Sequence, residues 1–156
     1  MSINVTSPVT GGPQTGFASP TYTVVPDTAP PGNPGRQSAV TALGGTQTGV
    51  TTHSVASPFT VNFTRPSNLR VLGQPNPVTG VIQVVPTNTY KCIVRKGVLP
   101  LAGQAYRTAL FSATCDIPAG ADLADPANVR AGLSLFIGAL NQQSAGLGDT
   151  IMSGII

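Results

Sequence analysis

Apolar and polar side chains alternate along three successive segments between residues 58 and 117. An alternation with a period of two is the geometry of a β-strand that has one apolar and one polar face. Turn-rich connections join the segments, so consecutive antiparallel pairing is the simplest arrangement. The three predicted strands are residues 59–64, 88–97 and 105–117.

The two faces of this predicted sheet differ in chemistry. The apolar face collects Phe59, Val61, Phe63, Tyr90, Cys92, Val94, Ala109, Phe111, Ala113, Cys115 and Ile117. The other face is chiefly hydroxyl and amide, with two cations, and includes Thr60, Asn62, Thr64, Lys91, Arg95, Thr108, Ser112 and Thr114. One face therefore needs a cover, and the other can meet water or a polar partner.

The strand pattern stops at Pro118, and an amphipathic helix follows it. Asp125 before Pro126 predicts a helix N-cap with proline at the first helical position. The apolar stripe of this helix is Val129, Leu133, Phe136, Ile137 and Leu140. Such a short helix is marginal alone, so we expect it to dock on the apolar sheet face, its own or a partner's. Residues 141–146 break the helix, and Ser144 is expected to cap a short second one.

The N-terminal part of the chain is less regular, because glycine and proline interrupt it often. We expect a loop at 26–35, where prolines exclude a helix or a central strand, and a possible arm before residue 17. Further strand candidates are residues 21–25, 36–43, 44–56, 69–72 and 81–85.

The predicted fold class is α+β. It is an antiparallel sheet of about five strands plus an N-terminal hairpin or arm, followed by two C-terminal helices. We expect one domain over residues 1–156, divided into N-terminal strands and loops (1–57), the main sheet (58–117) and the helices (122–156).

Charged residues make up only 8% of the chain, against about a quarter in an ordinary soluble domain. Much of the surface is therefore expected to be buried against other copies of the chain; a low-charge, turn-rich β domain is the alternative. The net charge is +3, and five of the eight basic residues lie between Arg65 and Lys96, where no acid occurs. This basic middle is compatible with a polyanion partner, the alternative being a few solvated cations on strands.

The sequence contains few candidates for catalytic or metal-binding residues. The single histidine, His53, has no acid near it in the sequence and is expected to be solvated. Asp122 and Asp125 are interpreted as turn and N-cap residues. Cys92 and Cys115 lie inside predicted strands and are expected to be reduced, and with one histidine they do not form a standard zinc site. We expect no enzyme activity, cofactor, metal or membrane segment, and no signal peptide is recognisable.

The C-terminal part of the chain resembles the coat proteins of the single-stranded RNA bacteriophages, the levivirus group. The resemblance lies in residues 90–156, "YKCIVRKGVLPLAGQAYRTALFSATCDIPAGADLADPANVRAGLSLFIGALNQQSAGLGDTIMSGII". Their order of strand, short loop, strand, Ile-Pro step, long helix, break and short helix matches the order in that family.

The resemblance implies a function. Coat proteins of this group form homodimers whose sheets join edge to edge and whose helices interlock, and strand 105–117 is the expected edge. The dimers assemble, with T=3 geometry expected, into an icosahedral shell around the RNA genome in the bacterial cytoplasm.

The resemblance also implies site residues. The polar-face residues Thr60, Asn62, Thr64, Lys91, Arg95, Thr108, Ser112 and Thr114 become candidates for contact with RNA, including a hairpin that represses replicase translation. No aromatic is placed there for base stacking, because Tyr90 points to the apolar side and Tyr106 lies at a strand end. In the connection 97–104, the expected contacts between dimers are Val98, Leu99, Pro100 and Leu101.

Two other classes remain open at this point. One is a secreted pilus-like or adhesin β-sandwich, which the Thr, Gly and Pro richness suits but the C-terminal helices do not. The other is a monomeric RNA-binding barrel of the oligonucleotide/oligosaccharide-binding type.

Overall fold

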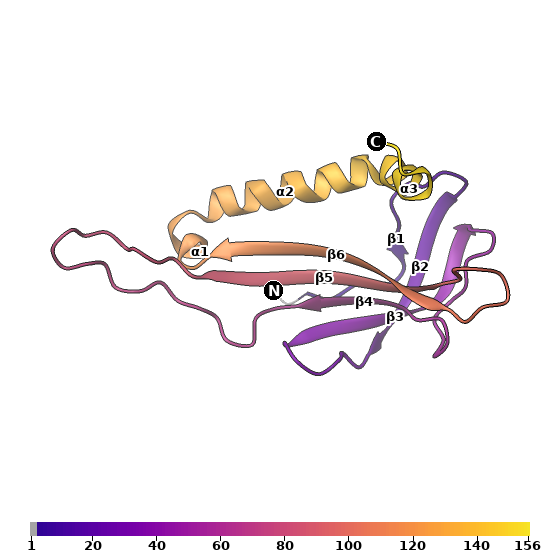
Figure 1. Cartoon of the computed structure of the whole chain (residues 1–156), viewed down its shortest axis with the longest axis horizontal. Helices are drawn as coiled ribbons and strands as arrows, with labels where there is room; N and C mark the ends of the chain where they lie inside the picture. The colour runs from indigo at the N-terminus through magenta and orange to yellow at the C-terminus, as the bar shows by residue number, and fades with distance from the viewer. Residues whose placement is uncertain (1–2) are drawn as a thin grey trace.

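The computed structural model describes residues 3–156 as one antiparallel sheet followed by helices (Figure 1). The six strands pair in chain order, so each strand is a neighbour of the next. They are β1 (Val9–Thr10), β2 (Ala18–Asp27), β3 (Gly35–Thr46), β4 (Phe59–Thr64), β5 (Thr87–Val98) and β6 (Arg107–Pro118). The helices are α1 (Ala121–Ala124), α2 (Pro126–Gln142) and α3 (Ser144–Ser153). The predicted fold class is confirmed.

A single sheet separates this fold from the alternative classes. A β-sandwich needs two packed sheets, whereas all the strands found in residues 3–156 belong to one sheet. Its strand order runs β1 to β6 and does not close β1 onto β6, so the chain is not a closed barrel either.

The period-two pattern predicted β4, β5 and β6 well. The register pairs Phe63 with Cys92, and Cys92 with Ala113. Residues directly opposite in an antiparallel pair share a face, so the predicted apolar residues of the three strands do lie on one side of the sheet. Figure 1 shows α2 running above this side, along β5 and β6.

The N-terminal strands are longer than predicted and are curled away from the others at one end of the molecule (Figure 1). Strand β2 pairs with β3 through two irregularities in register, one after Ala18 and one after Thr23. Such bulges increase the local twist, and they carry β1 and β2 toward α3.

Three expected strands are absent. The segments 44–56, 69–72 and 81–85 contain no strand of their own, although β3 extends to Thr46. Their apolar residues have no neighbouring strand to pair with, and prolines and glycines break the last two into turns.

The predicted N-terminal capping residue is confirmed for α2 but not for α3. Asp125 accepts a hydrogen bond from the Asn128 backbone N–H at 3.3 Å, and Pro126 opens α2. Ser144 was expected to cap the second helix, which is wrong: α3 begins at Ser144, its N-cap position is Gln143, and no side chain caps it. The short helix α1 was not predicted.

The core of one copy is small. Within residues 3–156 the buried apolar residues are Val24, Ala39, Val40 and Ala119, and none of them is completely shielded from solvent. None of the residues of α2 or α3 is buried. The apolar face of the sheet and the apolar side of α2 are therefore not covered by this chain alone. No helix within residues 3–156 has the length and hydrophobicity required to cross a bilayer.

Candidate assembly surfaces and nucleic-acid interface

The predicted polar face forms as a continuous surface across β4, β5 and β6. Its register is ordered in rows: Thr60 lies opposite Arg95, and Arg95 lies opposite Leu110. In another row Thr64 lies opposite Lys91, and Lys91 opposite Thr114. The pairing thus brings the predicted RNA-contact residues together on the side of the sheet that faces away from α2.

These residues fall into three groups by solvent exposure. Thr60 and Asn62 are only 4% and 3% exposed, because β4 lies between β3 and β5 and the side chains of both neighbours flank it. Thr64 and Arg95 are half-buried. The exposed members, which a large ligand could reach directly, are Lys91, Thr108, Ser112 and Thr114.

Unsatisfied polar atoms gather at the centre of this face. Gln37 lies opposite Asn62 in the register, and Arg95 lies opposite the neighbouring Thr60. Gln37 Oε1, Asn62 Oδ1 and Arg95 Nη1 are buried and have no hydrogen-bond partner in the chain. Buried polar atoms without partners are costly, and these three lie beneath the exposed residues of the face. Sequence reasoning missed Gln37, since β3 lacks a clear alternation.

The face also carries two carboxylates that sequence reasoning had not placed there. Asp116 lies opposite Thr89 and accepts a hydrogen bond from its hydroxyl. Asp27 accepts from Gln37 Nε2 at 2.7 Å and from the Thr28 backbone N–H at 2.8 Å. These two bonds, that from Gln37 first, lower the pKa of Asp27 below its ordinary value. The surface is therefore mixed, with its cations concentrated at Lys91 and Arg95.

Lys96 points to the opposite face of the sheet, where its contacts stabilise the fold. Its Nζ donates to the carbonyl oxygen and the hydroxyl of Thr51, at 2.9 and 2.8 Å, and lies 4.8 Å from the centre of the Phe59 ring. Burial lowers the pKa of Lys96 below its ordinary value. The Phe59 ring also packs edge-on against Tyr22, with centroids 5.6 Å apart.

His53 has a structural role that its sequence context did not predict. The loop between β3 and β4 brings it beside β4, where Nδ1 accepts a hydrogen bond from the Phe59 backbone N–H at 3.0 Å. The His53 backbone N–H donates to the Val40 carbonyl oxygen at 2.9 Å. The expectation of a solvated histidine is wrong, because its ring is half-buried and holds the start of β4.

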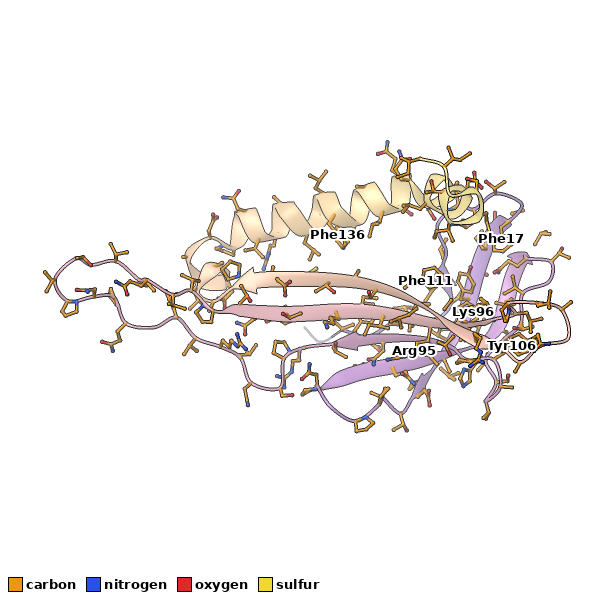
Figure 2. All side chains as sticks on the ribbon, in the orientation of Figure 1. Phe17, Arg95, Lys96, Tyr106, Phe111 and Phe136 are labelled. Carbon is orange, nitrogen blue, oxygen red and sulfur yellow. The ribbon has the colours of Figure 1, made fainter. Side chains whose placement is uncertain are left out.

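An open groove of about 930 Å³ separates α2 from the apolar side of the sheet. Figure 2 shows Phe136 on the side of α2 that faces the sheet. The helix residues that line the groove are Leu133, Phe136, Ile137 and Leu140. From the strands, its apolar lining comes from Phe63, Tyr90, Cys92, Ala113 and Cys115.

The groove shows that α2 is not packed down onto its own sheet. Phe136 is still 38% exposed, and Leu133, Ile137 and Leu140 are more exposed. Val129, the remaining member of the predicted stripe, is half-buried and does not line the groove. Of the two docking targets that the sequence left open, the chain's own sheet is therefore covered only loosely.

The two cysteines lie on the groove side of β5 and β6. Both are free thiols and half-buried. Burial raises the pKa of Cys92, and the neighbouring Cys115 raises it further. Both effects keep the Cys92 thiol protonated, as expected of a structural rather than a reactive cysteine.

The connection between β5 and β6 lies at the end of the molecule opposite α1 (Figure 1). Val98 is the last residue of β5, and Leu99, Pro100 and Leu101 follow it. All four are exposed. They form an uncharged apolar surface at this end.

No cluster of three or more metal-ligating side chains occurs within residues 3–156. Asp125 is used as the α2 cap, and Asp122 lies in the first turn of α1. The expected cap role of Asp125 is confirmed, whereas Asp122, expected in a turn, lies in the short helix α1.

Comparison with known structures identifies a close relative. A chain from a structure described as a virus-like particle of bacteriophage ESE020 is 55% identical, with a TM-score of 0.95, over 99% of this chain and 100% of that one. A virus-like particle of Beihai levi-like virus 32 is also similar, at 18% identity and a TM-score of 0.44, over 92% of this chain and 90% of that one. No protein-family model matches the sequence, and no curated protein matches it.

The relative from bacteriophage ESE020 is similar over the whole length of both chains, and it forms a particle. The order of strands and helices in residues 90–156 agrees with the family resemblance noted in the sequence. This chain belongs to the levivirus-like coat proteins of the RNA bacteriophages, and its role is structural.

Proposed function

We propose that two copies of this chain form a dimer, and that the dimers assemble into an icosahedral shell around single-stranded RNA. The observation that carries the proposal is the exposed apolar side of α2 above an open groove. Burying a side chain such as Leu133 or Phe136 contributes on the order of 1.5–3 kcal/mol. A second copy can supply the cover that one copy lacks.

The free edge of β6 supports a two-fold contact. This strand is 12 residues long, and within residues 3–156 its only strand neighbour is β5. Phe111 and Leu110, on its two faces, are both exposed. A long, flat, apolar edge pairs readily with another strand. Pairing of β6 with β6 of a second copy uses the same patch twice, as a two-fold axis requires.

The helices then interlock across this axis. In the proposed dimer, apolar side chains of the second copy fill the groove beneath α2 and cover the apolar face around Phe63 and Phe111. This arrangement supplies the core that Val24, Ala39, Val40 and Ala119 alone do not provide.

The polar face is directed to the interior and contacts the RNA. Lys91 and Arg95 neutralise phosphates, which makes the affinity dependent on salt. The exposed hydroxyls of Thr108, Ser112 and Thr114 donate to phosphate or base edges. Thr60, Asn62 and Thr64 form the floor beneath these exposed groups. Recognition of one specific hairpin requires, in addition to phosphate contacts, contacts with its exposed bases.

The loop after β5 completes the shell. Leu99 and Leu101 are exposed, and no charged residue lies between Lys96 and Arg107. We propose contacts between dimers there, in a T=3 particle that assembles in the bacterial cytoplasm.

Expression of the chain in bacteria tests this proposal. Electron microscopy of the purified material, with size-exclusion chromatography after mild dissociation, is expected to reveal RNA-containing shells built from dimers. A stable monomer that forms no particles would contradict it.

A further inference from the structure

The connection between β4 and β5, residues 65–86, projects well beyond the sheet (Figure 1). We call it the 65–86 arm. Connections longer than about 12–15 residues without helix or strand are uncommon in compact domains and are usually functional or disordered. The contacts of this arm distinguish between these two cases.

The base of the arm is anchored to the rest of the chain. The Arg70 backbone N–H donates to Asn88 Oδ1 at 2.8 Å, and Asn88 Nδ2 donates to the Arg70 carbonyl oxygen at 3.0 Å. The Ser67 hydroxyl donates to Asn33 Oδ1 at 2.8 Å. These bonds tie the arm to β5 and to the loop between β2 and β3.

The tip of the arm is also ordered by its own contacts. Asn76 Oδ1 accepts from the backbone N–H groups of Val78 and Thr79, at 2.8 and 3.2 Å, which is an Asx turn. The Gly80 N–H donates to the Asn76 carbonyl oxygen at 2.8 Å, and the Asn76 N–H donates to the Val81 carbonyl oxygen at 3.0 Å. Gly80 has a φ of 69°, a value that glycine adopts without strain. The tip therefore has a defined shape before any partner binds.

The outer part of the arm, residues 71–86, is rich in apolar side chains and uncharged, whereas its base carries Arg65 and Arg70. No charged residue occurs between residues 71 and 86. Val78, at the tip, is 90% exposed. The other exposed apolar side chains of this stretch include Val71, Leu72, Val81, Val84 and Val85. Exposed apolar surface of this extent marks an interaction site, and prolines at 75, 77 and 86 limit the entropy lost when the arm is fixed.

The composition of residues 71–86 indicates the kind of partner that the arm binds. Residues 71–86 contain neither a cation nor an aromatic residue. Contact with nucleic acid needs cations or stacking side chains, and binding to a bilayer surface usually uses basic and aromatic anchors. An uncharged aliphatic tip instead fits an apolar protein surface, and a particle built from this chain offers such surfaces on every copy.

We infer that the tip of the 65–86 arm packs against a second copy of this chain, in a contact between dimers of the shell. The inference rests on the proposed assembly. The arm and the apolar loop after β5 lie at opposite ends of the molecule (Figure 1). A contact made by two different surfaces can repeat from copy to copy and close into a shell.

The test compares three full-length proteins expressed in bacteria: the natural sequence, the double variant Val78→Ser with Val81→Ser, and the control Val55→Ser. Val55 is fully exposed in the loop between β3 and β4, so the control removes the same kind of side chain elsewhere. The yield of particles is measured by sedimentation and electron microscopy. The fold of the dissociated protein is measured by circular dichroism and thermal melting.

The double variant is expected to keep its fold and to yield about tenfold fewer particles, whereas Val55→Ser assembles normally. An undiminished yield from the double variant would overturn the inference and assign the tip to an outside partner. An equal loss in Val55→Ser would overturn it too. If the natural sequence itself forms no particles, the proposed assembly fails, which is a distinguishable result.

Discussion

The side-chain amide of Gln14 donates two hydrogen bonds to Ser144, one to its carbonyl oxygen and one to its hydroxyl, both at 2.8 Å. Gln14 lies in the turn before β2, and Ser144 is the first residue of α3. The contact ties the N-terminal hairpin to the C-terminal helices, so it holds one end of α2 above the groove. A side chain at Gly148 would meet Gln14 Oε1 and displace the Gln14 amide from its position beside α3.

Gln14→Ala is therefore expected to loosen α3. The loss of two partly buried hydrogen bonds reduces the free energy of unfolding by about 1–2 kcal/mol and speeds amide hydrogen exchange in α3. Thr15→Val is the control, because the bond from Thr15 to Asp149 is exposed and its loss costs less than about 0.5 kcal/mol. Equal effects of the two substitutions would show that the Gln14 contact has no special role.

His53→Ala is expected to destabilise the start of β4. The Phe59 N–H then has no acceptor, and leaving such a partly buried donor unpaired costs about 1–3 kcal/mol. His53→Asn places a carbonyl oxygen near the position of Nδ1 and recovers part of the loss. Urea unfolding of the dissociated protein measures both changes. No difference between the Ala and Asn variants would contradict the hydrogen-bond role.

The sequence predicted these contacts unevenly, for physical reasons. The alternation around Phe63, Cys92 and Ala113 specifies which face each side chain occupies, so β4, β5 and β6 were predictable. It does not specify which neighbours flank a side chain, so the burial of Asn62 and the nearby Gln37 was not. His53 depends on a bond to Phe59 that forms only when the loop folds back.

The same limit applies at the C-terminus. The Asp125–Pro126 cap is local and was predicted correctly. Ser144 looked like a cap in the sequence, but its hydroxyl instead accepts from Gln14, which is far away in the chain. The docking surface of α2 could not be predicted either, because its apolar side chains face a groove that one copy leaves open.

Asp27→Asn is expected to change how stability depends on pH. The bonds from Gln37 and Thr28 lower the pKa of Asp27 in the folded chain from its ordinary value of 3.8. The stabilisation from the ionised carboxylate is fully present above pH 3.8 and is lost as the pH falls through the lowered value. The natural chain should thus exceed the variant in urea midpoint at neutral pH. This difference should shrink in strong acid, and a constant difference would contradict the assignment.

Leu99→Ser with Leu101→Ser is expected to impair assembly. Both side chains are exposed after β5, and polar replacements remove the apolar contact that we propose between dimers. Dimers should persist in size-exclusion chromatography, while particles become fewer in electron micrographs. Leu123→Ser, in exposed α1, is the control. Normal shells from the double variant would mean that this loop is not a shell contact.

The amount of RNA in the particles shows whether the polar face contacts the genome. The double variant Lys91→Ala with Arg95→Ala removes two cations from the polar face, and Arg107→Ala with Arg130→Ala removes the same charge elsewhere. Arg107 alternates with Thr108 and so lies on the opposite face of β6, and Arg130 lies on α2.

Ultraviolet absorbance and extracted RNA per particle are compared among the natural chain and both variants. We expect the Lys91/Arg95 variant to form dimers but to package about twofold less RNA, whereas the Arg107/Arg130 variant packages a normal amount. Unchanged RNA in particles of the Lys91/Arg95 variant would contradict the placement of the polar face against the genome.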